Sequence, residues 1–79
     1  MAHFTNVVYT RHAIDRMQQR RISKEEVEAV LRFGEGYLDD DEFWVFEMET
    51  LHDRRLRVIV TESGDDARVV TVMRLRRAT

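Results

Sequence analysis

The chain has 79 residues, of which 43% are hydrophobic and 35% charged, with a formal net charge of −2 at pH 7. This length predicts one domain over residues 1–79, with no room for a second domain or a large enclosed cofactor chamber. The absence of cysteine excludes a disulfide, a thiolate nucleophile and a Cys-based zinc site. Its apolar runs fall far short of the roughly 18 residues that cross a bilayer, so we expect a cytoplasmic protein without a membrane partner.

Charge is unevenly distributed along the chain. Residues 1–34 hold six basic and four acidic side chains, residues 35–53 hold eight acidic and no basic ones, and residues 54–79 hold seven basic and three acidic ones. Two basic ends therefore flank an acidic middle. This pattern fits either a positive face that meets nucleic acid or simple pairing of the blocks within the fold.

The first third of the chain predicts an extended segment and then a helix. Residues 4–9 are rich in β-branched and aromatic side chains, which favours a short strand or an extended arm. Thr10 is a good N-cap, and apolar residues follow it at helical spacing. We therefore expect a first helix over about residues 11–20.

A second helix follows after a short link. Ser23 and Glu26 have the spacing of a capping box, and Gly34 is expected to end the helix as a C′ glycine. The link is so short that the helices must meet at a tight angle, with Ile22 turned inward.

Beyond Gly36 the apolar period changes from 3.6 to 2, which is typical of strands. Residues 42–50, 54–61 and 67–76 each fit a strand, and two short connections join them into a meander. The predicted fold class is α+β, with two N-terminal helices packed on a three- or four-stranded antiparallel sheet.

The register of the first hairpin follows from its charges. Placing Glu49 opposite Arg55 and Glu47 opposite Arg57 pairs opposite charges and keeps apolar residues together on the other face. The face toward the helices is then expected to carry Trp44, Phe46, Met48, Leu56, Val58, Val60, Val69, Thr71, Met73 and Leu75. The open face is expected to carry Val45, Glu47, Glu49, Arg55, Arg57, Ile59, Val70, Val72, Arg74 and Arg76.

One stretch carries a family resemblance. Thr10 is followed by His12-Ala13, by arginines four and eight residues after the histidine, and by Ile22-Ser23, with two closing strands near the end of the chain. In this pattern the chain resembles the family called domain of unknown function 4258, although Arg21 stands where that pattern usually has glycine. The family in turn resembles the RelE-like and BrnT-like toxins. The resemblance implies a RelE-like toxin fold and a metal-independent endoribonuclease that acts on messenger RNA and is neutralised by an antitoxin protein.

The residues themselves supply what such chemistry needs. Metal-free RNA cleavage requires a base for the 2′-OH proton, cations for the charge that develops on phosphorus and an acid for the 5′-oxygen. His12, Arg16 and Arg20 recur every four residues on one helix face, where they span about 12 Å. The positive end of the helix dipole favours the neutral imidazole that a base requires. Glu47 is a second acid/base candidate.

The remaining predictions concern binding. Arg55, Arg57, Arg74 and Arg76 are predicted to contact nucleic acid, and no cofactor or metal is expected, because the acidic run from Asp39 to Glu42 lacks the spacing of a calcium loop.

A structural alternative stays open for the helix residues, in which the arginines pair with the chain's own carboxylates and His12 only orients the helix start. A functional alternative is a non-catalytic module that binds a protein partner, or forms a homodimer, through the open sheet face or an edge strand.

Overall fold

The computed structural model describes residues 6–50 and 54–75. Two helices precede most of a five-stranded sheet with strand order β1-β5-β4-β3-β2, in which β1 runs parallel to β5 and the other neighbours are antiparallel. The elements are β1 (Asn6–Tyr9), α1 (Arg11–Arg20), α2 (Lys24–Phe33), β2 (Glu35–Leu38), β3 (Trp44–Glu49), β4 (Arg55–Ser63) and β5 (Asp66–Leu75).

The α+β class and the helix pair are confirmed, but the expectation of a three- or four-stranded antiparallel sheet is wrong. The sheet is mixed because the two helices carry the chain from β1 at one edge to β2 at the other, which leaves β1 parallel to β5. β2 escaped prediction because its four residues include a glycine and are all exposed, so they give no apolar alternation.

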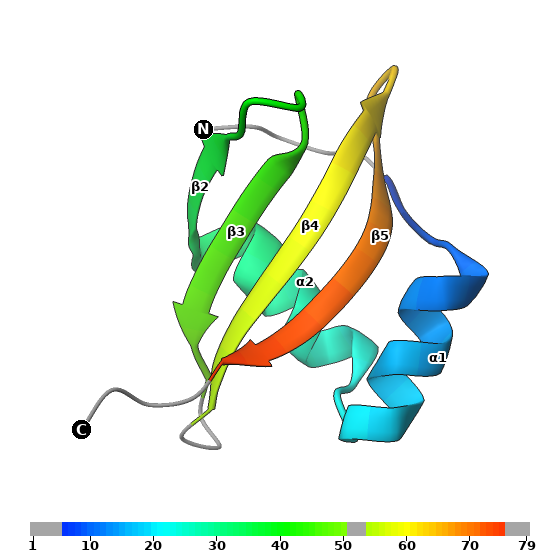
Figure 1. The fold of residues 1–79 in the computed structure, drawn as a ribbon, viewed down its shortest axis with the longest axis vertical. Coiled ribbons are helices and arrows are strands. Elements are labelled where there is room, and N and C mark those ends of the chain that lie inside the picture. Colours follow the sequence, from blue (N-terminus) through cyan, green and yellow to red (C-terminus); the bar gives the residue numbers. More distant parts are fainter. Residues whose placement is uncertain (1–5, 51–53, 76–79) are drawn as a thin grey trace.

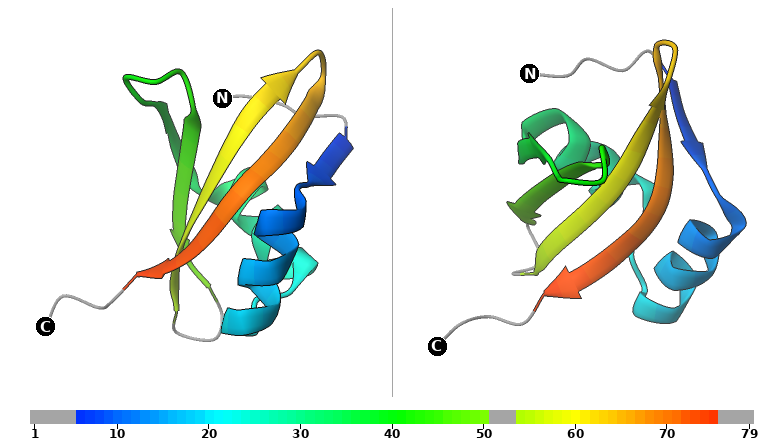
Figure 2. Two further views of the ribbon diagram at one scale, coloured as in Figure 1. Left: turned by 45° about the vertical axis from the view of Figure 1, so that its right-hand side comes forward. Right: turned by 45° about the horizontal axis from the view of Figure 1, so that its top comes forward.

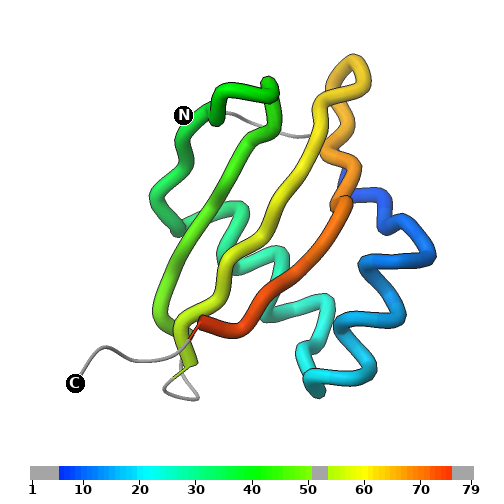
Figure 3. The backbone as a smooth tube through the Cα atoms, in the orientation of Figure 1, coloured from blue at the N-terminus to red at the C-terminus, as the bar shows by residue number. Residues whose placement is uncertain are grey.

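The helices lie on one face of the sheet. α2 crosses behind β3 and β4, whereas α1 lies beside β5 and continues the edge that β1 begins (Figures 1 and 2). The backbone trace shows the same arrangement, with the tip of the β4–β5 hairpin at the top of the view (Figure 3). The core lies between the helices and this face. Its buried members are Ala13, Met17, Ile22, Val27, Val30, Leu31, Phe46, Leu56, Val58, Val60, Ala67, Val69 and Val72.

Both helix starts are confirmed. The Thr10 hydroxyl accepts a hydrogen bond from the Ala13 N–H, and Ser23 and Glu26 form a complete capping box. α1 ends at Arg21, which adopts the left-handed conformation with φ of 54°, and this turn places Ile22 in the core. Arg21 therefore takes a conformation that glycine adopts more easily.

Gly34 ends α2 as expected, but not in a left-handed conformation. Its φ is −75° and its ψ is 164°, so the backbone there is extended. A Cβ at this position would lie 2.5 Å from the carbonyl oxygen of Val30 and 2.8 Å from that of Glu47. Close approach of the backbone, rather than a positive φ, explains the glycine.

The register predicted for the β3–β4 hairpin is confirmed. Glu49 lies opposite Arg55, Glu47 opposite Arg57 and Phe46 opposite Val58. Charge pairing and alternation were sufficient because both point to the same register.

The orientation predicted for the second half of β5 is wrong. Val60 pairs with Val69 and Ile59 pairs with Thr71, so Val70 is an extra residue in a β-bulge. Beyond the bulge each side chain points to the face opposite from the one predicted. Val72 lies in the core, whereas Thr71, Met73 and Leu75 share the open face with the charged residues of β3 and β4.

Candidate nucleic-acid interface

The three predicted helix residues form a stripe on α1, here called the α1 stripe (His12, Arg16 and Arg20). His12 is exposed and both arginines are partly exposed. Arg16 Nη1 donates to Gln19 Oε1 at 3.4 Å, and Arg20 Nη1 donates to the carbonyl oxygen of Val72 at 3.3 Å. None of the ion pairs found in residues 6–50 and 54–75 involves this stripe.

Thr10 fixes α1 against the bulge of β5. Its hydroxyl donates to the carbonyl oxygen of Val70 at 3.1 Å while it accepts the N–H of Ala13, and its own N–H donates to the carbonyl oxygen of Val69. One residue thus satisfies a bulge carbonyl and a free helix N–H together. The α1 stripe is therefore held along the second half of the β5 edge, where Arg20 meets Val72.

Arg54 closes the other end of α1. Its Nη1 donates to the carbonyl oxygens of Arg20 and Arg21 at 3.3 and 2.9 Å. A cation suits these carbonyls because they form the negative end of the helix dipole. Sequence reasoning missed this contact, since nothing local relates the start of β4 to the end of α1.

These contacts gather arginines at one end of the molecule, here called the basic end. The end of α1 and the ends of β4 and β5 that meet there lie together in the lower part of Figure 1. The basic end comprises Arg20, Arg21, Arg54, Arg55 and Arg74.

The opposite end of the long axis is acidic. The loop between β2 and β3 and the tip of the β4–β5 hairpin both lie there (Figure 1). The side chain of Asp39 accepts the N–H groups of Asp41 and Phe43 at 2.9 Å, so its carboxylate closes a turn. In the described ranges no group of three or more metal-ligating side chains is gathered closely enough to hold a metal ion. The acidic end comprises Asp39, Asp40, Asp41, Glu42, Glu62, Asp65 and Asp66.

Glu47 forms a separate ionic cluster on the open face of the sheet, here called the Glu47 cluster (Glu47, Arg55 and Arg57). Arg57 Nε lies 2.8 Å from Glu47 Oε2, and Arg55 Nη2 lies 3.3 Å from Glu47 Oε1. Only 15% of the Glu47 side chain is exposed. Glu47 and Arg57 face each other as a non-hydrogen-bonded pair, the arrangement that brings side chains closest.

The two predicted catalytic groups do not meet. Glu47 lies on β3, two strand spacings or roughly 10 Å from β5 at about 4.8 Å per spacing, and the α1 stripe lies farther still, on the helix that packs against β5. The prediction that Arg74 shares the open face with Arg55 and Arg57 is wrong. The bulge turns Arg74 to the face of Leu56, its partner on β4. Arg76 falls outside the described residues.

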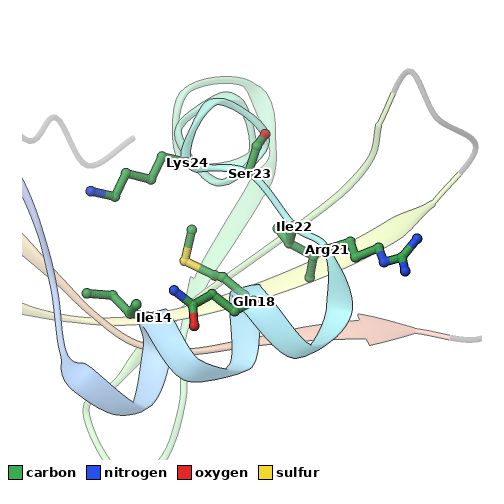
Figure 4. Close-up of a pocket in the computed structure, with 7 residues that line it drawn as sticks. Ile14, Gln18, Arg21, Ile22, Ser23 and Lys24 are labelled. Carbon is green, nitrogen blue, oxygen red and sulfur yellow. The ribbon is translucent and has the colours of Figure 1, made fainter.

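An open groove of about 360 Å³ lies between α1 and the start of α2 (Figure 4), and no residue of the α1 stripe lines it. Two buried residues, Met17 and Ile22, contribute to its lining, and in Figure 4 the Arg21 side chain extends away from the other labelled residues. The groove is lined by Ile14, Met17, Gln18, Arg21, Ile22, Ser23 and Lys24.

Next to the groove, a hydrogen bond between Tyr9 and Glu28 joins β1 to α2. Tyr9 donates its hydroxyl to Glu28 Oε2 at 3.2 Å, and the Lys24 ammonium lies 5.1 Å from the centre of the Tyr9 ring. Burial, together with the Glu28 carboxylate, raises the pKa of Tyr9 well above its usual range. Tyr9 therefore serves as a neutral donor that ties β1 to α2.

Together these features define a small α+β domain whose long axis joins an acidic end to an arginine-rich end. Residues 9–74 match the family model for the domain of unknown function DUF4258, so the chain belongs to that family. No curated protein and no solved structure matches the chain significantly. Neither helix of the described structure has the length and apolar character required to cross a membrane.

Proposed function

We propose that this protein is a toxin-like, metal-independent endoribonuclease that holds RNA along the α1 stripe and the adjoining basic end. The resemblance of its family to the RelE-like and BrnT-like toxins suggests the class. The physical support lies in a row of side chains that is open to solvent, carries two guanidinium groups and adjoins further arginines at the end of α1.

One observation carries the proposal. Arg16 bonds to an amide side chain and Arg20 to a backbone carbonyl, while the ion pairs found among the described residues join Asp15 to Arg11 and Glu47 to Arg55 and Arg57. A neutral partner leaves the positive charge uncompensated. Phosphate groups bind to such positively charged side chains, and the binding releases counterions from the nucleic acid.

The proposed reaction is an internal transesterification. His12 takes the proton of a ribose 2′-OH, and the 2′-oxygen then bonds to the adjacent phosphorus while the bond from phosphorus to the 5′-oxygen breaks. Arg16 and Arg20 bear the negative charge that develops on the phosphorane. The leaving 5′-oxygen takes a proton from a water molecule, which in turn takes the proton held by His12. The products are a 2′,3′-cyclic phosphate and a 5′-hydroxyl.

Glu47 takes no part in this scheme. Its two carboxylate oxygens already accept from Arg57 and Arg55, and it lies two strands away from β5. Its proposed role is to hold these two arginines on the sheet.

Expression in a bacterial host tests the proposal. We expect the intact chain to slow growth and fragment cellular RNA, and His12→Ala to do neither. Arg11→Ala is the matched control, because Arg11 lies next to His12 on the same helix and pairs with Asp15 at 3.4 Å. It should behave like the intact chain.

Two results would count against the enzyme. Growth and RNA that stay normal with the intact chain and with His12→Ala, at equal protein levels, would contradict the proposed activity. Equal toxicity of both would place the chemistry elsewhere. A partner protein that abolishes the toxicity by covering the α1 stripe would fit the role of an antitoxin.

A further inference from the structure

Large exposed apolar side chains gather at the β2 edge of the sheet. Four large hydrophobic residues stand out as exposed in the described part of the chain, and three of them lie in or just before β2: Phe33 (72%), Tyr37 (51%) and Leu38 (53%). All four residues of β2 are exposed. An edge strand has unpaired backbone N–H and C=O groups, so an exposed edge with apolar side chains can pair with a further strand.

The backbone groups that face outward can be assigned. Asp39 donates its N–H to the carbonyl oxygen of Phe43, so the odd-numbered residues of β2 point their hydrogen-bonding groups toward β3. The N–H and C=O groups of Gly36 and Leu38 then point away from the sheet. No strand of the described chain pairs with this edge.

We propose that β2 pairs antiparallel with β2 of a second copy of this chain, joining the two sheets into one. A two-fold axis passes through the pair in this arrangement, so each copy offers the other the same surface. This proposal is independent of the nuclease, because β2 and the α1 stripe lie at opposite edges of the sheet.

Charge selects the register. Pairing Gly36 with Leu38 of the second copy would oppose Glu35 with Asp39, which places like charges face to face and destabilises a sheet. Pairing Leu38 with Leu38 would carry Glu35 past the end of β2, into the turn that the Asp39 carboxylate closes, where no strand continues. Pairing Gly36 with Gly36 instead opposes Glu35 with Tyr37, whose hydroxyl is a suitable donor to a carboxylate.

This register also makes the flanking charges complementary. Arg32 in the last turn of α2 comes next to the acidic loop of the second copy at Asp40, and the reverse contact forms on the other side of the axis. Leu38 lies opposite Gly34, where no side chain obstructs it. At the axis, Gly36 is required by the fold itself, because a Cβ there would lie 2.4 Å from the ring of Phe46.

Sedimentation across the micromolar to millimolar range tests the pairing. We expect the intact chain to form dimers, and Leu38→Pro to weaken dimerisation by about tenfold or more, since it removes an outward N–H from each copy but no bond to β3. Val8→Lys is the control, because Val8 is 48% exposed but lies on β1 at the opposite edge. It should dimerise like the intact chain.

A charge reversal keeps the test decisive if Leu38→Pro unfolds. Arg32→Glu and Asp40→Arg should each weaken dimerisation, and the double variant should restore it. The proposal is overturned if the intact chain stays monomeric throughout, if Val8→Lys rather than Leu38→Pro abolishes the dimer, or if the double variant dimerises no better than the singles.

Discussion

The α1 stripe and the Glu47 cluster contain the same kind of side chain in different electrostatic surroundings. Arg55 and Arg57 both contact the carboxylate of Glu47, whereas the hydrogen bonds of Arg16 and Arg20 within residues 6–50 and 54–75 go to neutral oxygen atoms. A carboxylate compensates the charge of a guanidinium, but a carbonyl or amide only orients it. The residue type alone therefore does not mark a phosphate site, because the partner decides whether the charge remains available.

The same comparison separates stability from function. The Glu47 cluster joins β3 to β4 and is partly sheltered, so it contributes to the stability of the sheet. The α1 stripe lies on a helix whose position is set by Thr10 and Arg54 instead. Substitutions in the two regions should therefore have opposite consequences for folding and for RNA binding.

The largest effect is expected for the double variant Arg16→Ala and Arg20→Ala. Its affinity for single-stranded RNA should fall roughly 10- to 100-fold at low salt, and the slope of log affinity against log salt should decrease by about 1.4. Stability should fall by no more than about 1 kcal/mol, because neither arginine makes an ion pair among the described residues and the main loss is the hydrogen bond of Arg20 to Val72. Fluorescence anisotropy at several salt concentrations measures the RNA affinity and its salt dependence. An unchanged slope would contradict the claim that the α1 stripe binds phosphate while the Glu47 cluster does not.

The double variant Arg55→Ala and Arg57→Ala should show the reverse pattern. We expect its free energy of unfolding to fall by about 1 to 2 kcal/mol, a value kept low because solvent screens partly exposed pairs. Its RNA affinity should fall less than that of the first variant. Urea denaturation measures the stability, with Glu47→Gln as a companion that should lose similar stability while binding RNA more tightly. A larger RNA defect than in the Arg16 and Arg20 variant would contradict the assignment.

Thr10→Val sharpens the comparison by loosening α1 alone. Loss of the hydroxyl removes a helix cap and the donor to Val70, and should cost about 1 kcal/mol of stability. Thr10→Ser, which keeps the hydroxyl, should retain most of it. Denaturant midpoints for the three proteins provide the measurement. Equal midpoints for Thr10→Val and the intact chain would contradict the claim that Thr10 fixes α1 against β5.

The smallest effect at neutral pH is expected from Tyr9→Phe. Because burial raises the pKa of Tyr9 in the folded protein, the unfolded chain loses this proton first, from about pH 10. The stability that the neutral phenol provides is thus complete below about pH 10 and is lost as the pH rises further. Denaturation from neutral to alkaline pH should show a steeper loss for the intact chain than for Tyr9→Phe. Parallel profiles would argue against a partly buried Tyr9 that stays neutral in the folded protein.

Local signals in the sequence were sufficient wherever several of them agreed. Thr10, Ser23 and Glu26 cap the helices as predicted, and the charges of the β3–β4 hairpin predicted its register because each opposite-charge pair kept the apolar residues on the other face. The family was likewise evident from the residues around His12.

Other features depend on contacts between distant segments. The run Val69-Val70-Thr71-Val72 fits a strand in either orientation, so nothing in it marks the bulge that buries Val72 and turns Arg74 to the helix side. The contact of Arg54 with the end of α1, and the bonding of Glu47 to two arginines at once, depend equally on tertiary structure. The sequence therefore predicted the members of the α1 stripe but not which arginines would be neutralised.

Incubation of the purified protein with labelled RNA and excess chelator tests the central claim most directly. The intact chain and Arg11→Ala should produce fragments that end in a 2′,3′-cyclic phosphate, and His12→Ala should produce none while binding RNA with similar affinity. RNA that remains whole in every reaction, or fragments formed equally well by His12→Ala, would contradict the assignment of the α1 stripe as a ribonuclease site.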